Sequence, residues 1–166
     1  MPLRNGMILD ATALIDFCWL NEWEWLHRYY SPLYIAQEVL DSDRLTDRTR
    51  QSAQEYLTPL TLNTEEMFVS FLEFGSQFPL LSIPDCSTIA IARHQLLICA
   101  SDDGLVVETC IAYNIAYTRT LRLLSEMAIG KHKTTAEVIK MAEDLIEERG
   151  KYIKPEILRD WKKQLP

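Results

Sequence analysis

The chain has 166 residues and a net charge of −7, with 48% hydrophobic and 25% charged residues. These values predict a globular domain with one core and argue against broad electrostatic binding of duplex nucleic acid, which usually requires a basic chain. No run approaches the roughly 18 uninterrupted apolar residues of a membrane span, and the N-terminus lacks the apolar region of a signal peptide, so we expect no membrane association. The four cysteines form no C-x-x-C pair, and we expect buried thiols in a reducing, cytoplasmic compartment.

Short apolar runs alternate with helical periodicity along the chain, which predicts a three-layer α/β/α fold with a parallel sheet of four to five short strands. We expect strands at residues 7–10, 33–36, 96–101 and 115–118, while residues 60–62 fit either a strand or a turn. We expect helices at residues 11–26, 37–41, 43–56, 64–74, 84–96, 104–113, 121–128 and 136–149. Gly75 and Pro79 are expected to end the helix that precedes them. Residues 1–130 are predicted to form the main domain, and residues 131–166 a helical extension packed on it.

Four apolar runs end in a carboxylate. The acids are Asp10, Glu38, Asp85 and the pair Asp102 and Asp103. Because the carboxyl ends of parallel strands meet at one edge of a sheet, we expect these side chains to gather there. Such a cluster repels itself unless a cation lies in it, and hard divalent cations prefer oxygen ligands. The pattern therefore predicts a site for Mg²⁺ or Mn²⁺ and a metal-dependent hydrolase.

Each of these acids also has a purely structural interpretation. Asp10, Asp102 and Asp103 each precede a predicted helix and would serve as its N-cap. Glu38 and Asp85 would complement the dipole in the first turn of a helix. Taken singly, the structural interpretation is at least as good, and only the joint placement of the acids favours a site. The two roles are compatible, because a capping carboxylate can also bind a metal.

The motifs that carry these acids resemble those of the PIN domain, a metal-dependent ribonuclease fold common in toxin–antitoxin systems. The matching segments are ILDATALI at residues 8–15, YIAQEVL at residues 34–40, IPDCSTIAIA at residues 83–92 and LLICASDDGL at residues 96–105. The resemblance spans residues 7–128 and depends on the order and spacing of the segments.

The resemblance implies which residues act. The implied catalytic acids are Asp10, Glu38, Asp85 and Asp103, and the implied metal ligands are Asp10, Asp85, Asp102 and Asp103. The fourth acid is Asp103 or Asp102, and the hydroxyl-x-acid pattern favours Asp103. Thr12 and Ser101 are implied supporting residues, although Thr12 could equally make a local cap hydrogen bond.

Four arginines are candidates for binding RNA phosphates. They are Arg44, Arg48, Arg93 and Arg119, and Arg50 belongs to the same basic patch as Arg44 and Arg48. Arginine suits phosphate because its guanidinium donates paired hydrogen bonds. The alternative is an ordinary solvated face or surface ion pair.

The predicted function is that of a metal-dependent endoribonuclease cleaving single-stranded RNA. The resemblance further implies a toxin with a small antitoxin partner, and it admits a homodimer. The aromatic stretch at Trp19, Trp23 and Trp25 would bind an antitoxin helix, or it belongs to the core. One alternative is a non-catalytic PIN-like binding module with a degenerate metal site. Another is a phosphotransferase with Asp10 as nucleophile, although Thr12 stands where haloacid-type phosphatases usually carry a second aspartate.

Overall fold

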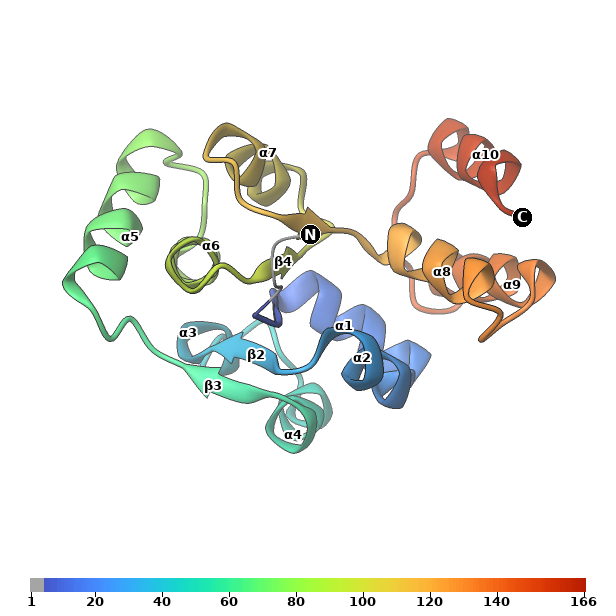
Figure 1. Ribbon diagram of the computed structural model, residues 1–166, viewed down its shortest axis with the longest axis horizontal. Coiled ribbons are helices and arrows are strands. Elements are labelled where there is room, and N and C mark those ends of the chain that lie inside the picture. Colours follow the sequence, from blue (N-terminus) through green and yellow to red (C-terminus); the bar gives the residue numbers. More distant parts are fainter. Residues whose placement is uncertain (1–4) are drawn as a thin grey trace. The chain divides into compact units, whose positions relative to one another are not determined.

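The structure is a computed structural model that describes residues 5–166, and the chain divides between Thr118 and Arg119 into two compact units. Within the described residues, the first unit contains one sheet of five parallel strands in the order β3-β2-β1-β4-β5 (Figure 1). The strands are β1 (Met7–Leu9), β2 (Leu33–Ala36), β3 (Thr58–Leu60), β4 (Ile98–Ala100) and β5 (Tyr117–Thr118). The parallel α/β architecture confirms the predicted fold class.

Helices cover both faces of the sheet. They are α1 (Ala11–Leu20), α2 (Trp23–Tyr30), α3 (Gln37–Leu40), α4 (Asp47–Tyr56), α5 (Glu65–Gln77), α6 (Ile83–Gln95) and α7 (Gly104–Ala112). One layer contains α1, α2 and α4, with α1 packed on β1 and α4 on β3 (Figure 1). The opposite layer contains α5, α6 and α7, with α6 packed across β1, β2 and β4. The result is the three-layer α/β/α arrangement that the sequence predicts.

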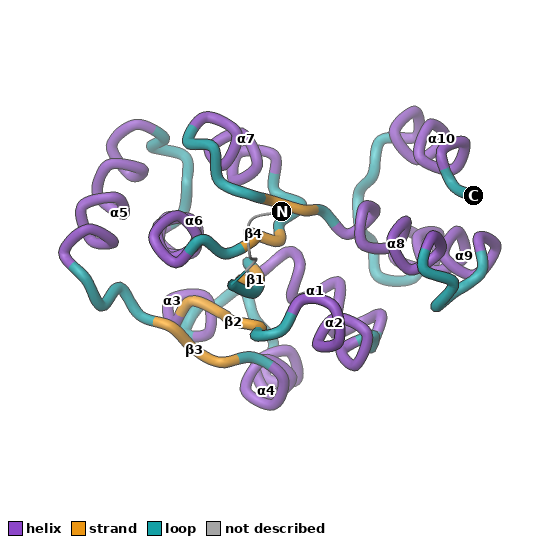
Figure 2. Tube along the Cα trace, in the orientation of Figure 1, coloured by secondary structure: helices purple, strands orange, loops and turns teal. Residues whose placement is uncertain are grey.

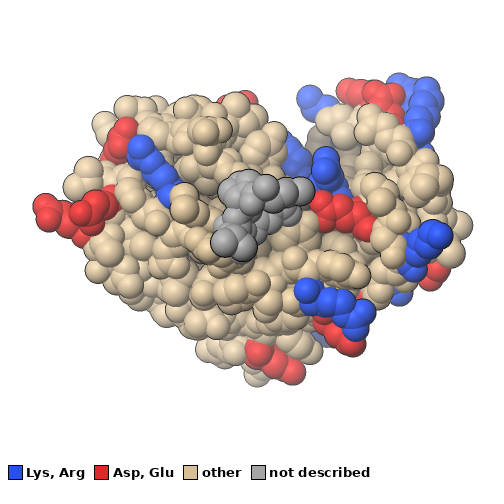
Figure 3. Space-filling view, in the orientation of Figure 1, with Lys and Arg blue, Asp and Glu red and all other residues tan. Residues whose placement is uncertain are grey.

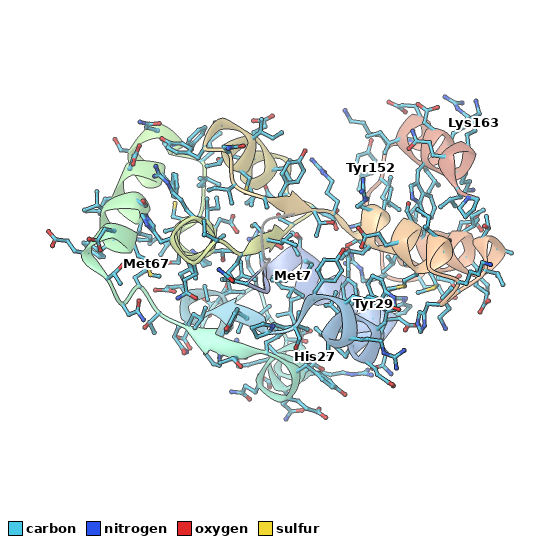
Figure 4. The ribbon with its side chains drawn as sticks, in the orientation of Figure 1. Met7, His27, Tyr29, Met67, Tyr152 and Lys163 are labelled. Atoms are coloured by element: carbon cyan, nitrogen blue, oxygen red, sulfur yellow. The ribbon has the colours of Figure 1, made fainter. Side chains whose placement is uncertain are left out.

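The central strand explains why its sequence is apolar without alternation. Met7, Ile8 and Leu9 are all fully buried, because helices cover both faces of β1 and strands flank both of its edges. Met7 lies deep inside the first unit (Figure 4). An uninterrupted apolar run of this kind therefore identifies a central parallel strand, and the acid that follows it stands at the strand's carboxyl end.

The helix predicted over residues 11–26 is wrong in its extent, because two helices occupy this stretch. Helix α1 ends where Asn21 adopts a left-handed conformation, with φ of 53°, and donates its backbone N–H to the carbonyl of Phe17. Asparagine tolerates this region better than most residues do. Helix α2 then begins at Trp23 and continues to Tyr30, beyond the predicted end.

Gly75 does not end α5, contrary to the prediction. The helix continues to Gln77, and the backbone N–H of Phe78 bonds the carbonyl of Phe74. A single glycine inside a helix costs only about 1 kcal/mol, which the packing of α5 on α6 offsets. The ambiguous segment near residue 60 is a strand, and Pro59 is accommodated because β3 is at the edge of the sheet. The other boundaries differ from the predicted ones by a few residues.

The second unit is helical. Its helices are α8 (Thr120–Ile129), α9 (Thr135–Glu147) and α10 (Pro155–Gln164), shown in Figure 2. Helix α8 packs against α9, and the indole N–H of Trp161 on α10 donates to the carbonyl of Leu121 (3.0 Å) and to the hydroxyl of Ser125 (2.7 Å) on α8. The predicted division of the domains at residue 130 stays a prediction. Among residues 5–166, no helix has the length and apolar character needed to cross a membrane.

Candidate active site

Three neighbouring strands deliver acidic residues to the same edge of the sheet. Glu38 follows β2, Asp10 follows β1, and Asp102 and Asp103 follow β4 after Ser101. The chain runs from β1 outward to β2 and β3 on one side, whereas β4 and β5 lie on the other. The strand order therefore reverses between β1 and β4, and the crevice at such a switch point is where parallel α/β sheets bind ligands.

Asp10 is the centre of the cluster and is fully buried. Its Oδ1 accepts hydrogen bonds from the backbone N–H of Ala13 (3.0 Å) and from the hydroxyl of Thr12 (2.7 Å). Its Oδ2 accepts a hydrogen bond from the hydroxyl of Ser101. Asp10 thus caps α1, as its structural interpretation predicts, while it also binds the hydroxyl of Ser101, which directly follows β4.

Two hydroxyl groups join the ends of β1 and β4. Besides binding Asp10, the oxygen of Thr12 accepts a hydrogen bond from the backbone N–H of Asp102 (2.9 Å). The oxygen of Ser101 accepts one from the backbone N–H of Asp103 (3.0 Å). The carboxylate of Asp10 and the backbone N–H groups of Asp102 and Asp103 are therefore held by the same two side chains, while the functional roles of Thr12 and Ser101 stay predictions.

Asp103 is the N-cap of α7. Its Oδ1 accepts hydrogen bonds from the backbone N–H groups of Leu105 (2.9 Å) and Val106 (3.2 Å). The charge of Asp103 acts on Asp85, where it favours the protonated form. The choice between Asp103 and Asp102 as the fourth acid stays a prediction.

Asp85 comes from the first turn of α6 and is 5% exposed. The hydroxyl of Ser82, which caps this helix, accepts the backbone N–H of Asp85 at 3.2 Å. Burial raises the pKa of Asp85, and the charge of Asp103 raises it further, whereas Ser82 and Arg44 oppose the shift. Nη1 of Arg44 lies 4.0 Å from Oδ2 of Asp85.

The electrostatics of Asp10 make its ionised form costly within the folded protein. Burial raises the pKa of Asp10 to about 7, and the nearby charge of Asp85 adds to the rise. The hydrogen bonds from Ala13, Ser101 and Thr12 oppose it but do not cancel it. A carboxylate that is costly to ionise beside other carboxylates gains most from a bound cation.

Glu38 contributes an unpartnered oxygen. Its residue is half-buried in the first turn of α3, and Oε2 is buried without a hydrogen-bond partner among the described residues. A buried carboxylate oxygen normally has a partner, so this one is available to a group that the chain does not supply. Helix α3 packs against α6, the helix that carries Asp85.

The donors suit a hard divalent cation held partly through water. All of the candidate ligands are carboxylates, and within residues 5–166 no three His, Cys, Asp or Glu side chains come close enough to enclose a metal ion. Mg²⁺ fits such a site, because it keeps several waters and needs only one or two carboxylates together with substrate phosphate oxygens. The orphan oxygen of Glu38 and the raised pKa of Asp10 are consistent with that mode of binding.

The structure separates the four candidate arginines. Arg44 lies at the acidic cluster, whereas the charge of Arg48 on α4 acts on Cys18 of α1. Arg93 lies two turns beyond Asp85 on α6, where it pairs with Glu73. Arg119 belongs to the second unit, directly before α8.

Ser82 was absent from the sequence-based set, and Arg50 was predicted only as part of a basic patch with Arg44 and Arg48. Ser82 positions Asp85, and the S-x-x-D spacing at the start of α6 is a capping signature that would have identified it. Arg50 fixes the loop that carries Arg44, because its guanidinium donates to the carbonyls of Leu40 (2.9 Å) and Ser42 (2.9 Å). No short-range pattern in the sequence reveals that second role.

Comparison with known proteins agrees with this architecture. The family model DUF3368, described as a PIN domain, matches residues 6–165. The chain therefore belongs to the PIN-domain family, whose members are generally nucleases. Among solved structures, the chain is similar to PAE2754 from Pyrobaculum aerophilum, with 18% sequence identity, a TM-score of 0.51, and coverage of 75% of this chain and 90% of that chain. That similarity shows a shared fold. No match is found among curated proteins.

Proposed function

We propose that this protein is a metal-dependent endoribonuclease that cleaves single-stranded RNA. The observation that carries the proposal is the buried carboxylate of Asp10, which is fixed by Thr12 and Ser101 and has a pKa raised by burial and by the nearby charge of Asp85. Its place at the switch point of a PIN-domain sheet supports a catalytic rather than a purely structural role.

The residues of the cluster would have two roles, metal binding and orientation of Asp10. Asp10, Asp85 and Asp103 would hold Mg²⁺ or Mn²⁺, and Glu38 would add its unpartnered oxygen. The bound ion would supply a Lewis acid for hydrolysis of a phosphodiester. Thr12 and Ser101 would keep Asp10 oriented, since both hydroxyls already donate to its carboxylate.

Arg44 is the arginine best placed to contact the RNA backbone. It is half exposed and lies 4.0 Å from Asp85, so its guanidinium could bind a phosphate at the cluster while the acids bind the metal. The net charge of −7 makes this local cation more important, because the rest of the chain does little to attract RNA.

The direct test is cleavage of a labelled single-stranded RNA with Mg²⁺ or Mn²⁺ by the wild type and by Asp10→Asn. We expect metal-dependent cleavage by the wild type and nearly none by the variant, with the variant's fold retained in circular dichroism. Cleavage by Asp10→Asn at the wild-type rate would contradict the assignment. A duplex of the same sequence serves as the control substrate and should be cleaved poorly.

The second candidate is a PIN-like binding module that has lost its metal site. The observation in its favour is that no three potential ligands within residues 5–166 are close enough to enclose an ion. Titration with Mn²⁺ separates the two: saturable binding with a rise in melting temperature supports the nuclease, and neither effect supports the module.

The same proposal includes a toxin role and a cytoplasmic location. The toxin role predicts growth arrest when the intact protein is expressed, and relief of the arrest by a small protein encoded next to it. Asp10→Asn should express without arrest. Arrest by the wild type and the variant alike would mean that growth inhibition is not caused by the nuclease.

A further inference from the structure

Helix α5 presents an apolar face to solvent. Phe68, Val69 and Leu72 are 50%, 55% and 54% exposed and occupy neighbouring positions on its outer side. The opposite side is used for packing, since Met67, labelled in Figure 4, and Phe74 are buried. These three residues lie on adjacent turns of one face, so they form a contiguous apolar patch and not scattered exposed residues.

A cavity lies beside this face, between α5 and α6. Its volume is about 510 Å³, and its lining residues are Glu65, Glu66, Val69, Ser70, Glu73, Arg93 and His94. Val69 belongs both to the lining and to the apolar face, so the cavity and the face form one continuous surface. We refer to this surface as the α5 surface.

The polar groups at the base of the cavity already bind one another. The hydroxyl of Ser70 lies 2.6 Å from Nε2 of His94 and accepts a hydrogen bond from Arg93 (3.2 Å). Arg93 also pairs with Glu73 (3.6 Å), which accepts a hydrogen bond from the hydroxyl of Tyr113 (3.0 Å). These contacts join α5 to α6 and to Tyr113, which follows α7. The polar groups therefore already have hydrogen-bond or ion-pair partners within the protein.

The remaining charge on the α5 surface is negative and unpaired. Glu65 and Glu66 are exposed, and within residues 5–166 the structure gives neither side chain an ion pair or a hydrogen bond. Helix α5 contains no lysine or arginine. Acidic side chains project at the outer edge of α5 (Figure 3). The occupant that matches this surface is apolar on one side and positively charged beside it.

We propose that the α5 surface is a docking site for a basic amphipathic helix of another protein. Its apolar side would cover Phe68, Val69 and Leu72, and a lysine or arginine from it would enter the cavity beside Glu65 and Glu66. A second copy of this chain matches less well, because its own α5 brings three more glutamates and no base. RNA is excluded as the occupant by its negative charge. The surface involves none of the proposed catalytic acids.

The experiment measures fluorescence anisotropy of a labelled, helical leucine–lysine peptide added to the full-length protein. A scrambled peptide of identical composition, which cannot form an apolar face, is the first control. The test variants are Leu72→Ser and the pair Glu65→Lys with Glu66→Lys. The matched controls are Ile111→Ser and Glu108→Lys, exposed residues of the same types on α7.

We expect the wild type and both α7 variants to bind the amphipathic peptide alike, and both α5 variants to bind it about tenfold more weakly. The charge variant should also lose most of the salt dependence of binding. Equal binding by all five proteins, or equal binding of the scrambled peptide, would overturn the proposal. Sedimentation of the protein alone is the second measurement: a dimer that Leu72→Ser converts to a monomer would assign the surface to a second copy and also overturn it.

Discussion

The hydroxyl of Ser101 donates a hydrogen bond to the carboxylate of Asp10, although 91 positions separate the two residues in the chain. The bond runs from the carboxyl end of β4 to that of β1, the two strands between which the strand order reverses. The same hydroxyl accepts the backbone N–H of Asp103. One side chain thus holds two acids of the candidate site in fixed relation.

Replacing Ser101 tests this relation. In Ser101→Ala, Oδ2 of the buried Asp10 loses its donor, and we expect a loss of about 1–3 kcal/mol in the free energy of unfolding. RNA cleavage should fall by about 10- to 100-fold, as it does when groups that orient metal ligands are removed. Ser101→Thr keeps the hydroxyl and is the control. If both variants cleave RNA like the wild type, Ser101 does not orient the site.

The raised pKa of Asp10 predicts how stability depends on pH in metal-free protein. Its folded pKa of about 7 lies above the ordinary carboxyl value of 3.8, so between these pH values the folded state binds the proton more tightly than the unfolded state does. Stability therefore falls as pH rises from about 4 to about 7 and changes little above that range, by an amount on the order of a few kcal/mol. Urea unfolding in EDTA across this range measures the effect.

Asp10→Asn provides the comparison for that experiment. The amide carries no charge, so the variant should lose this part of the pH dependence and be more stable than the wild type at pH 8. A parallel pH dependence in both proteins would show that Asp10 titrates normally.

Added metal should offset the loss of folding stability that ionised Asp10 causes. At pH 8, saturating Mg²⁺ or Mn²⁺ should stabilise the wild type by about 2–3 kcal/mol at a concentration near 100 times the dissociation constant. Glu38→Gln should need more metal to reach the same melting temperature, because its orphan oxygen is then neutral. Glu55→Gln on the exposed side of α4 is the matched control. An unchanged metal midpoint in Glu38→Gln would remove Glu38 from the site.

Arg44 and Arg48 form a natural pair for testing RNA binding. Arg44→Ala should raise KM for RNA about fivefold with little change in kcat, because a half-exposed arginine beside Asp85 would hold substrate rather than metal. Arg48→Ala should leave both constants unchanged, since that arginine does not contact the acidic cluster. Arg44→Lys should recover part of the loss. Equal effects of the two alanine variants would indicate non-specific attraction.

The sequence predicts the sheet and the capping roles of Asp10 and Asp103 well, because both depend on local pattern. An apolar run that is buried on two faces lacks alternation, and the acid at its end caps the next helix, as Asp10 and Asp103 do. The end of α1 at Asn21 was missed because an apolar periodicity continues through the break, and only a left-handed backbone conformation reveals it.

The arginines show what local pattern does not contain. Arg44 and Arg48 are four positions apart in the sequence, yet only Arg44 lies beside Asp85. The guanidinium of Arg50 binds the carbonyls of Leu40 and Ser42 and so fixes the loop that carries Arg44. Arg93 follows Asp85 on the same helix but lies two turns away, with Glu73 as its partner. Such placements depend on contacts between distant elements.

The two borders of the sheet have a further consequence. Pro59 interrupts the row of backbone donors in β3, and β5 contributes only two residues, Tyr117 and Thr118, on the other side. A strand from another molecule would find few matched hydrogen-bonding groups at either border. The sheet is therefore poorly suited to growth by strand addition, which protects a protein with a strongly apolar centre from aggregation.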